Sequence, residues 1–266
     1  MAMEVASPNP YGFTGERVTT EMTHITLREI LIRLFQGDKT PLHEFILAQE
    51  HLGRYKFAAY RLNLAGKKVL DVAGGDGYGS RLLKELGHPS EVVSVDIHLP
   101  TLNSARLKHG RYVDFSNANA QNLPFSNSSF PAVISFETYE HLRRPEIFLS
   151  EVSRVLTPNG TLILSTPNRN ISNPRTSKAN EPINPFHIFE VSPQEFLDDL
   201  KTFFRDVVIY GQRFNIKPSG EKRTFVDRLR NISSVITGES SQIHTFPSNS
   251  AEPAYLVAVC NDPIKS

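Results

Sequence analysis

A glycine-rich segment at residues 69–79, with the sequence VLDVAGGDGYG, most constrains what this chain can fold into. It follows a short apolar run that predicts a strand, Lys68–Val72, and it precedes a helical pattern over Ser80–Leu86 that Gly87 ends. Small residues between a strand and a helix let the backbone turn sharply and approach a ligand closely. The segment therefore predicts a ligand site at a strand–helix turn.

From Lys67 onward, apolar runs alternate with helical patterns, which is typical of a parallel sheet with crossover helices. Strands are expected at residues 68–72, 91–97, 111–115, 132–136, 161–165, 204–210 and 255–259. Helices are expected at 80–86, at 100–109, from Pro145 through Leu156, and from a capping box at Ser192 and Glu195 through Leu200. The pattern predicts an α/β fold with helices on both faces of a seven-stranded, mostly parallel sheet, whose last strand is antiparallel and inserted between neighbours.

Residues 1–62 precede this pattern and are expected to form an N-terminal helical cover, distinct from a sheet domain at 63–266. An apolar face predicts one helix over Leu27–Phe35, and a second is expected over Leu42–Leu62. Segments 167–190 and 211–253 are predicted to be insertions, with one helix near Phe225–Ile232. We expect the N-terminal helices and the insertions to cover the carboxyl ends of the strands.

Two acids at strand ends narrow the class of ligand. Asp71 lies in the glycine-rich segment, where it suits a ligand with an ammonium group and would repel a pyrophosphate. Asp96 ends the next strand, where an acid can accept both hydroxyls of a ribose. The G-x-G-x-x-G spacing of dinucleotide sites and the Gly-Lys-Ser/Thr of nucleoside triphosphate loops are both absent. A nucleoside sulfonium fits these acids best.

Five segments, in order, resemble the class I S-adenosylmethionine-dependent methyltransferase family. They are Leu70–Gly77, Asp96, Asn119–Phe125, Ile134–Leu142 and Leu156–Gly160. The chain departs from the family pattern at Ala73, which replaces a glycine, at Asn119, which replaces an aspartate, and at Pro131. Segments 15–17 and 50–55 look like leaders of bacterial methyltransferases that act on sugars, and 184–187 with 192–196 looks like the acceptor side of small-molecule O-methyltransferases.

The resemblance implies a Rossmann-like fold, S-adenosylmethionine as the cofactor and methyl transfer to a small polar acceptor, most of all a hydroxyl of a sugar or glycosylated metabolite. It also implies a cofactor site formed by Asp71, Ala73, Gly75, Gly77, Asp96, Ile97, Asn119, Ala120, Gln121 and Phe136. Methyl transfer from a sulfonium depends chiefly on the positions of donor and acceptor.

A hydroxyl acceptor benefits from a base that takes its proton, and His141 and His187 are the main candidates for it. His141 follows the fourth strand, at the edge where α/β sheets bind ligands, and His187 lies in an insertion. Glu137 and Glu140 are weaker candidates. A structural role for each histidine stays open. No metal site is expected, because the sequence shows no tight cluster of Asp, Glu and His at ligand spacing.

The overall composition limits other functions. The 29 basic and 28 acidic residues nearly balance, so no nucleic-acid or membrane partner is expected. A single cysteine, Cys260, excludes an internal disulfide, and the absence of a leader or a long apolar span predicts a cytoplasmic protein. The oligomeric state is left open, with a homodimer as one option. Two other functions also stay open: a nicotinamide-dependent reductase and a non-catalytic cofactor-binding module.

Overall fold

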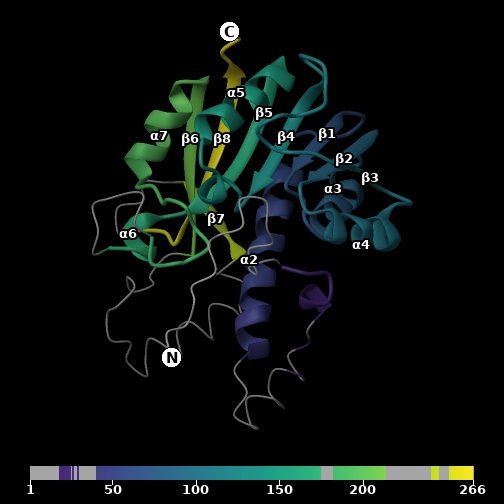
Figure 1. Ribbon diagram of the computed structural model, residues 1–266, viewed down its shortest axis with the longest axis horizontal. Coiled ribbons are helices and arrows are strands. Elements are labelled where there is room, and N and C mark those ends of the chain that lie inside the picture. The colour runs from purple at the N-terminus through teal and green to yellow at the C-terminus, as the bar shows by residue number, and fades with distance from the viewer. Residues whose placement is uncertain are drawn as a thin grey trace, which may run out of the picture.

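The computed structural model describes residues 18–24, 26, 29, 40–174, 182–213, 241–245 and 252–265. Its centre is one sheet with the strand order β3-β2-β1-β4-β5-β8-β6-β7 (Figure 1). The strands are β1 Lys68–Val72, β2 Glu91–Asp96, β3 Asp114–Asn117, β4 Phe130–Phe136, β5 Leu156–Pro167, β6 Phe204–Gln212, β7 Ile243–Thr245 and β8 Tyr255–Pro263. Strands β1 to β5 pair in parallel, and β8 runs antiparallel to both of its neighbours, β5 and β6.

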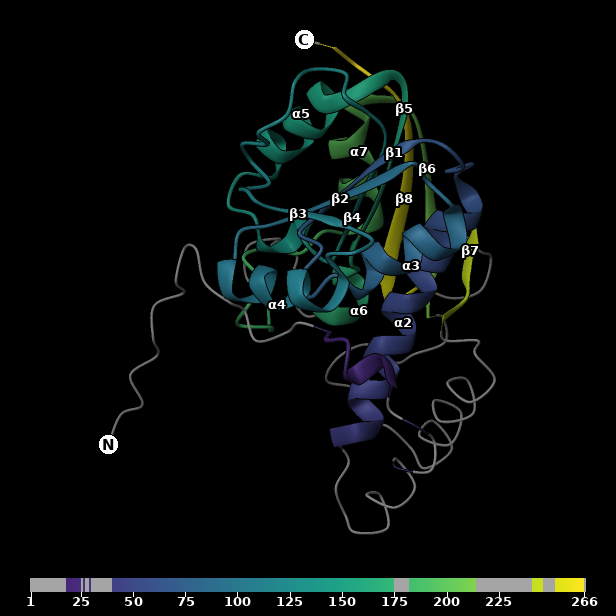
Figure 2. The same ribbon diagram turned by 90° about the vertical axis from the view of Figure 1, so that its right-hand side faces the viewer.

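Helices cover both faces of this sheet (Figure 2). The α-helices are α2 Thr40–Arg61, α3 Tyr78–Gly87, α4 Leu99–His109, α5 Pro145–Val155, α6 Arg169–Ser172 and α7 Pro193–Lys201, and the short 3₁₀ turns are η1 Met22–His24 and η2 Tyr139–His141. Side chains of successive strand residues point to opposite faces, so Leu70 packs into a core with α5 and α7, whereas Val69 packs into a second core with α2 and α3.

The structure confirms the predicted fold and adds to it. The antiparallel strand between β5 and β6 is the expected one, and the Ser192–Glu195 capping box opens α7. An eighth strand, β7, lies in the insertion at 211–253 and pairs with β6. β3 begins at Asp114 rather than at residue 111, because this half-exposed edge strand pairs only with β2 and lacks a continuous apolar run.

The end of the N-terminal region packs into the sheet domain. Tyr55 and Ala58 of α2 belong to the core that contains Val69. The division at residue 62 stays a prediction. The helices predicted at 27–35 and 225–232 lie outside the described residues, apart from Glu29.

The strand order places the carboxyl ends of β1, β2 and β4 side by side. β1 pairs with β2 on one side and with β4 on the other, and ligands of open α/β sheets bind where the strand order reverses in this way. α6 and η1 lie at this end of the sheet, and the first turns of α2 extend beyond it (Figures 1 and 2). None of the helices in the described part of the chain has the length and apolar run needed to cross a bilayer.

Candidate active site

The glycine-rich turn after β1 contains three residues in the left-handed backbone region. They are Ala73 with φ 59°, Gly75 with φ 57° and Gly77 with φ 80°. A side chain on Gly77 would also meet the Phe115 ring, since its Cβ would lie 2.6 Å from that ring. Ala73 adopts a conformation that favours glycine, so this departure from the family pattern costs conformational energy. The turn nevertheless keeps its hydrogen bond from Gly77 N to Gly74 O at 3.1 Å.

Asp71 lies beneath this turn and is fully buried, with 0% of its surface exposed. Its carboxylate accepts from Ser80 Oγ at 2.5 Å and from the Tyr55 hydroxyl at 3.2 and 3.3 Å. Burial raises the pKa of Asp71 to about 7; the two hydroxyl donors oppose this rise and the charge of Asp96 adds to it. Asp71 therefore joins α2, the turn and α3, and its contact with a ligand ammonium group stays a prediction.

Asp96 ends β2 and holds the turn from the other side. Its Oδ2 accepts from Gly75 N at 3.0 Å and its Oδ1 accepts from His98 N at 2.8 Å. Both oxygens thus accept from backbone donors at the carboxyl end of β2. A carboxylate oxygen can accept more than one hydrogen bond, so these contacts are compatible with binding of ribose hydroxyls.

The other residues predicted for the cofactor lie along the same edge. Ile97, just after β2, exposes 39% of its surface, as a side chain that packs on a ligand ring would. Asn119 Oδ1 accepts from Gln121 N at 2.9 Å, and the Gln121 side chain donates to Arg144 O at 2.7 Å. The side-chain oxygen of Asn119 therefore accepts a hydrogen bond within its own loop. Ala120 packs partly buried against the core, and Phe136 ends β4 with its ring 4.9 Å from that of Tyr55.

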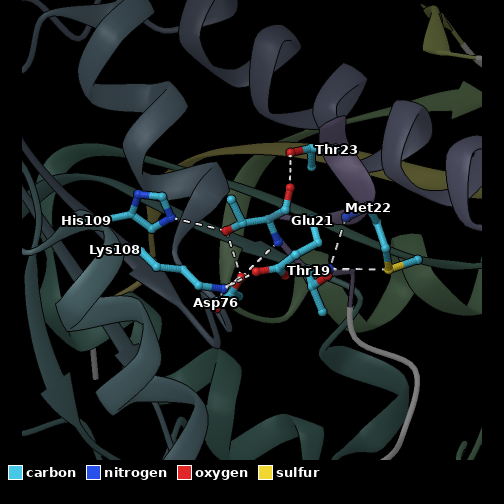
Figure 3. Close-up of polar contacts among 8 residues, drawn as sticks. Thr19, Glu21, Met22, Thr23, Asp76, Lys108 and His109 are labelled. Carbon is cyan, nitrogen blue, oxygen red and sulfur yellow. Dashed lines mark hydrogen bonds and ion pairs between the residues drawn. The ribbon is translucent and has the colours of Figure 1, made fainter. Parts of the chain in front are cut away.

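A segment before α2 contacts Asp76 of the glycine-rich turn (Figure 3). Asp76 Oδ2 accepts from Thr20 N at 2.8 Å and from Thr20 Oγ1 at 2.7 Å. Lys108 of α4 bonds both Asp76, at 3.1 Å, and Glu21, at 2.7 Å. His109 Nε2 lies 3.2 Å from Thr20 Oγ1. Residues 18–24 are thereby fixed beside the turn, at the edge where the sequence predicts a cover.

The two predicted bases, His141 and His187, lie next to each other. His141 ends η2, directly after β4, and its ring centroid is 5.2 Å from that of His187. His141 Nδ1 lies 2.9 Å from Phe186 O and His187 Nδ1 lies 2.6 Å from Glu190 Oε1. A carbonyl or a carboxylate oxygen only accepts, so in both neutral rings Nδ1 carries the hydrogen and Nε2 carries the lone pair. His187 Nε2 faces the Asn184 amide nitrogen at 3.0 Å.

Glu140 forms a cluster with His141 and His187 that was not expected from the sequence. A carboxylate oxygen of Glu140 and one ring nitrogen from each histidine lie within 4.8 Å of one another. The expectation of no tight Asp, Glu and His cluster is therefore wrong, because His187 comes from an insertion that folds back onto η2. Ile188 N donates to Glu140 O at 2.9 Å and fixes that fold-back. Burial raises the pKa of Glu140, and the charge of Glu137 adds to the effect.

A buried ionic network links α2 to the end of β4. Arg54 donates to Gln212 Oε1 at 2.9 Å and lies 3.6 Å from Glu137, and its guanidinium stacks over Tyr255. Glu50 pairs with Arg213 at 2.9 Å. Arg54 is thus a packing and ion-pairing residue in this structure, and Glu137, in the left-handed region at φ 50°, is held by Ser165.

Three functional residues were not identified from the sequence. Tyr55 is a donor to Asp71, Ser80 is another, and Glu190 orients His187. Ser80 is the first residue of the expected helix after the turn, and a small hydroxyl there is a signal that could have been read. Tyr55 and Glu190 reach the site only through tertiary packing.

Comparisons with known proteins find similar sequences and similar folds. A family model described as a methyltransferase domain matches residues 70–164. A probable S-adenosylmethionine-dependent methyltransferase of Mycolicibacterium smegmatis is 34% identical over 148 residues, which are 56% of this chain and 54% of that protein. A phthiotriol/phenolphthiotriol dimycocerosates methyltransferase of Mycobacterium leprae is 36% identical over 116 residues, 42% of each chain. The aligned regions span about half the length of these curated relatives.

Solved structures share the fold. A methyltransferase of Haloferax volcanii, in complex with an activator, superposes with a TM-score of 0.59 at 20% identity, covering 82% of this chain and 91% of that one. An S-adenosylmethionine-dependent methyltransferase of Thermotoga maritima gives a TM-score of 0.57 at 19% identity, covering 86% and 99%. The match of residues 70–164 to a methyltransferase domain, the curated relatives and the shared fold together support a class I S-adenosylmethionine-dependent methyltransferase domain in this chain.

Proposed function

We propose that this chain transfers the methyl group of S-adenosylmethionine to a hydroxyl of a small polar acceptor, a sugar or a glycosylated metabolite. The observation that carries the proposal is the meeting of His141 and His187 after β4, the strand that pairs with β1, with both Nδ1 atoms bound to acceptors. Both imidazoles therefore carry their lone pair on Nε2, the atom that accepts a proton.

For methyl transfer to a hydroxyl, the protein has to position the methyl donor and the acceptor and to remove the hydroxyl proton. Bound S-adenosylmethionine would supply an electrophilic methyl group with a thioether as the leaving group, and an imidazole of this chain would take the proton of the acceptor hydroxyl. His141 is the first candidate for this base because it follows β4, at the edge where α/β sheets bind ligands. A positioned base contributes about 10²–10⁴-fold to rate.

Four groups of this chain would hold the cofactor. Asp96 accepts from the ribose hydroxyls, the turn at Ala73–Gly77 approaches the ligand through its backbone, and Ile97 packs on the adenine. Asp71 supplies negative charge near the ammonium group. The buried, hydrogen-bonded state of both acids supports this assignment, because it fixes their positions before a ligand arrives.

Fewer observations support a sugar as the acceptor than support methyl transfer itself. The relatives named above include no sugar acceptor, so the sugar rests on the resemblance of segments 15–17 and 50–55 to leaders of sugar methyltransferases. The described parts of the insertions at 167–190 and 211–253 lie near the strand ends. Phe186 O lies 2.9 Å from His141 Nδ1, and Ser241 O accepts from Gln212 at 3.4 Å. This position suits segments that cover a small acceptor.

Calorimetry with S-adenosylmethionine, followed by product detection over a panel of sugars and glycosylated metabolites with amines as the comparison, tests the proposal. We expect binding, a raised melting temperature and methylation of hydroxyl compounds alone. His141→Ala should lower turnover about 100-fold or more and leave cofactor affinity unchanged. His88→Asn, at the opposite edge after α3, is the matched control.

Three results would contradict parts of this proposal. Stabilisation by a nicotinamide cofactor instead of S-adenosylmethionine would support a reductase. Cofactor binding without turnover on any acceptor would indicate a binding module. Full activity in both His141→Ala and His187→Ala would show that transfer depends on position alone.

A further inference from the structure

The cluster formed by Glu140, His141 and His187 has the composition of a metal site. Its ligand atoms lie within 4.8 Å of one another. Three ligands of one ion, each at about 2.1 Å, lie at most about 3.6 Å from one another, so the side chains need to close by about 1 Å to hold an ion. Two imidazoles and one carboxylate are a ligand set that first-row transition-metal ions prefer.

The outer contacts of the histidines are those of metal ligands. A metal-bound histidine almost always donates its other ring N–H to a carboxylate or a backbone carbonyl, which fixes the ring and raises its basicity. His187 donates to Glu190, whose side chain is 1% exposed, and His141 donates to the Phe186 carbonyl. Glu190 is in turn held by Ser172 Oγ at 2.5 Å.

Glu140 supplies a second, independent observation. Its side chain is 1% exposed, and Oε2 accepts from Thr166 Oγ1 at 3.1 Å. Oε1 has no hydrogen-bond partner among the described residues, and the His141 Nε2 atom is 3.9 Å away. A buried carboxylate oxygen without a partner costs folding energy, and here it points toward the histidine ring nitrogens.

We infer that Glu140, His141 and His187 bind one divalent transition-metal ion, of the Zn²⁺ or Mn²⁺ class. The ion would take Glu140 Oε1 and the Nε2 atoms, whose lone pairs are set by the outer contacts. Binding requires the Asn184 amide, now 3.0 Å from His187 Nε2, to turn away by a side-chain rotation. Mg²⁺ is disfavoured because it prefers oxygen ligands and an octahedral shell.

The ion would change how the proposed acceptor is activated, and this consequence rests on the proposed function. A bound Zn²⁺ lowers the pKa of a coordinated water to about 7. An acceptor hydroxyl in an open coordination position would lose its proton more readily in the same way. The histidines would then hold the ion, and solvent would receive the proton.

The test measures metal binding by the full, tag-free chain, without cofactor or acceptor. The chain is stripped with a chelator and titrated separately with Zn²⁺, Mn²⁺ and Mg²⁺, with calorimetry for affinity and elemental analysis for stoichiometry. We expect one Zn²⁺ or Mn²⁺ per chain and a raised melting temperature. Glu140→Gln and His187→Ala should each weaken binding about tenfold or more, and His88→Asn should not.

The outcomes separate this inference from methyl transfer. No stoichiometric uptake of Zn²⁺ or Mn²⁺, or undiminished uptake by both variants, overturns the metal site. Glu140→Gln keeps the side-chain shape and should melt no lower than the unsubstituted chain without metal; if it fails to fold, His187→Ala carries the comparison. Full methyl transfer by a chelator-treated chain that binds no ion would leave the proposed function standing with His141 as base, whereas metal uptake by a chain that methylates nothing would leave this inference standing.

Discussion

Replacing Asp71 by asparagine should make the folded chain more stable above pH 7 than the unsubstituted chain. The Asp71 carboxylate has no exposed surface, and burial raises its pKa from 3.8 to about 7. The folded state therefore binds the proton more tightly than the unfolded state between these two values, and its free energy of unfolding falls as the pH rises through this window. Each pH unit inside the window is worth about 1.4 kcal/mol.

The change in the free energy of unfolding can be calculated from the difference between the Asp71 pKa values of the unfolded and folded chain. Between pH 5 and pH 8 the unsubstituted chain should lose about 2–3 kcal/mol of stability through Asp71, most of it below pH 7. The amide of Asp71→Asn does not titrate, and its oxygen can still accept from one of the hydroxyls of Tyr55 and Ser80. The difference in free energy of unfolding between the two chains should thus shift by the same amount, about 2–3 kcal/mol, between pH 5 and pH 8.

Urea unfolding at pH 5, 6, 7 and 8 measures this difference. Other titrating groups, including Glu140, are common to both chains and cancel. Parallel curves for the two chains across this range would refute the reasoning, because they would mean that the carboxylate is ionised at no extra cost in the folded state.

The same substitution tests the role of Asp71 toward the cofactor. A nearby ammonium group favours the ionised carboxylate, so the affinity of the unsubstituted chain for S-adenosylmethionine should rise between pH 6 and pH 8. The Asp71→Asn variant should bind more weakly and without this rise, as calorimetry would show. Equal affinities at every pH would restrict Asp71 to fixing Tyr55 and Ser80.

Three further substitutions test the turn. Ala73→Gly should raise the free energy of unfolding by about 0.5 kcal/mol in urea, because relief of the left-handed conformation at φ 59° exceeds the entropy that glycine adds to the unfolded chain. Gly79→Ala should lower it by about 1–3 kcal/mol, because the new Cβ would lie 2.1 Å from the Tyr55 ring. Asp96→Ala should weaken cofactor binding by about 1.5–3 kcal/mol in calorimetry; a lower melting temperature with unchanged affinity would mean that it only orders Gly75.

The strands that are buried on both faces were predictable from the sequence. β1 was predicted to the residue because its apolar run fills a position between two parallel neighbours. β3 and β7 were not, since one is a half-exposed edge strand of four polar and aromatic residues and the other has three residues. Such strands are set by pairing with a neighbour, and a local pattern carries little of that information.

Some residues of the candidate site were likewise predictable from the sequence, and others were not. Asp71 and Asp96 lie at the ends of strands that the sequence predicts, so their meeting at one edge follows from the parallel sheet. The approach of His187 to Glu140 depends on the path of an insertion far along the chain from η2, and on the Ile188 N to Glu140 O bond that fixes it. The absence of ligand spacing in the sequence therefore says little about metal binding when one ligand comes from an insertion.

Two buried carboxylates at this edge, Asp71 and Glu140, carry raised pKa values for the same reason, which is burial without a lysine or arginine in contact among the described residues. The guanidinium of Arg54 instead donates to Gln212, pairs with Glu137 and stacks over the Tyr255 ring. In the roles proposed above, a ligand would stabilise the charge of each carboxylate: the cofactor ammonium group for Asp71 and a metal ion for Glu140. Each ligand should accordingly release a proton as it binds near pH 6–7, and the chain should be most stable with both bound.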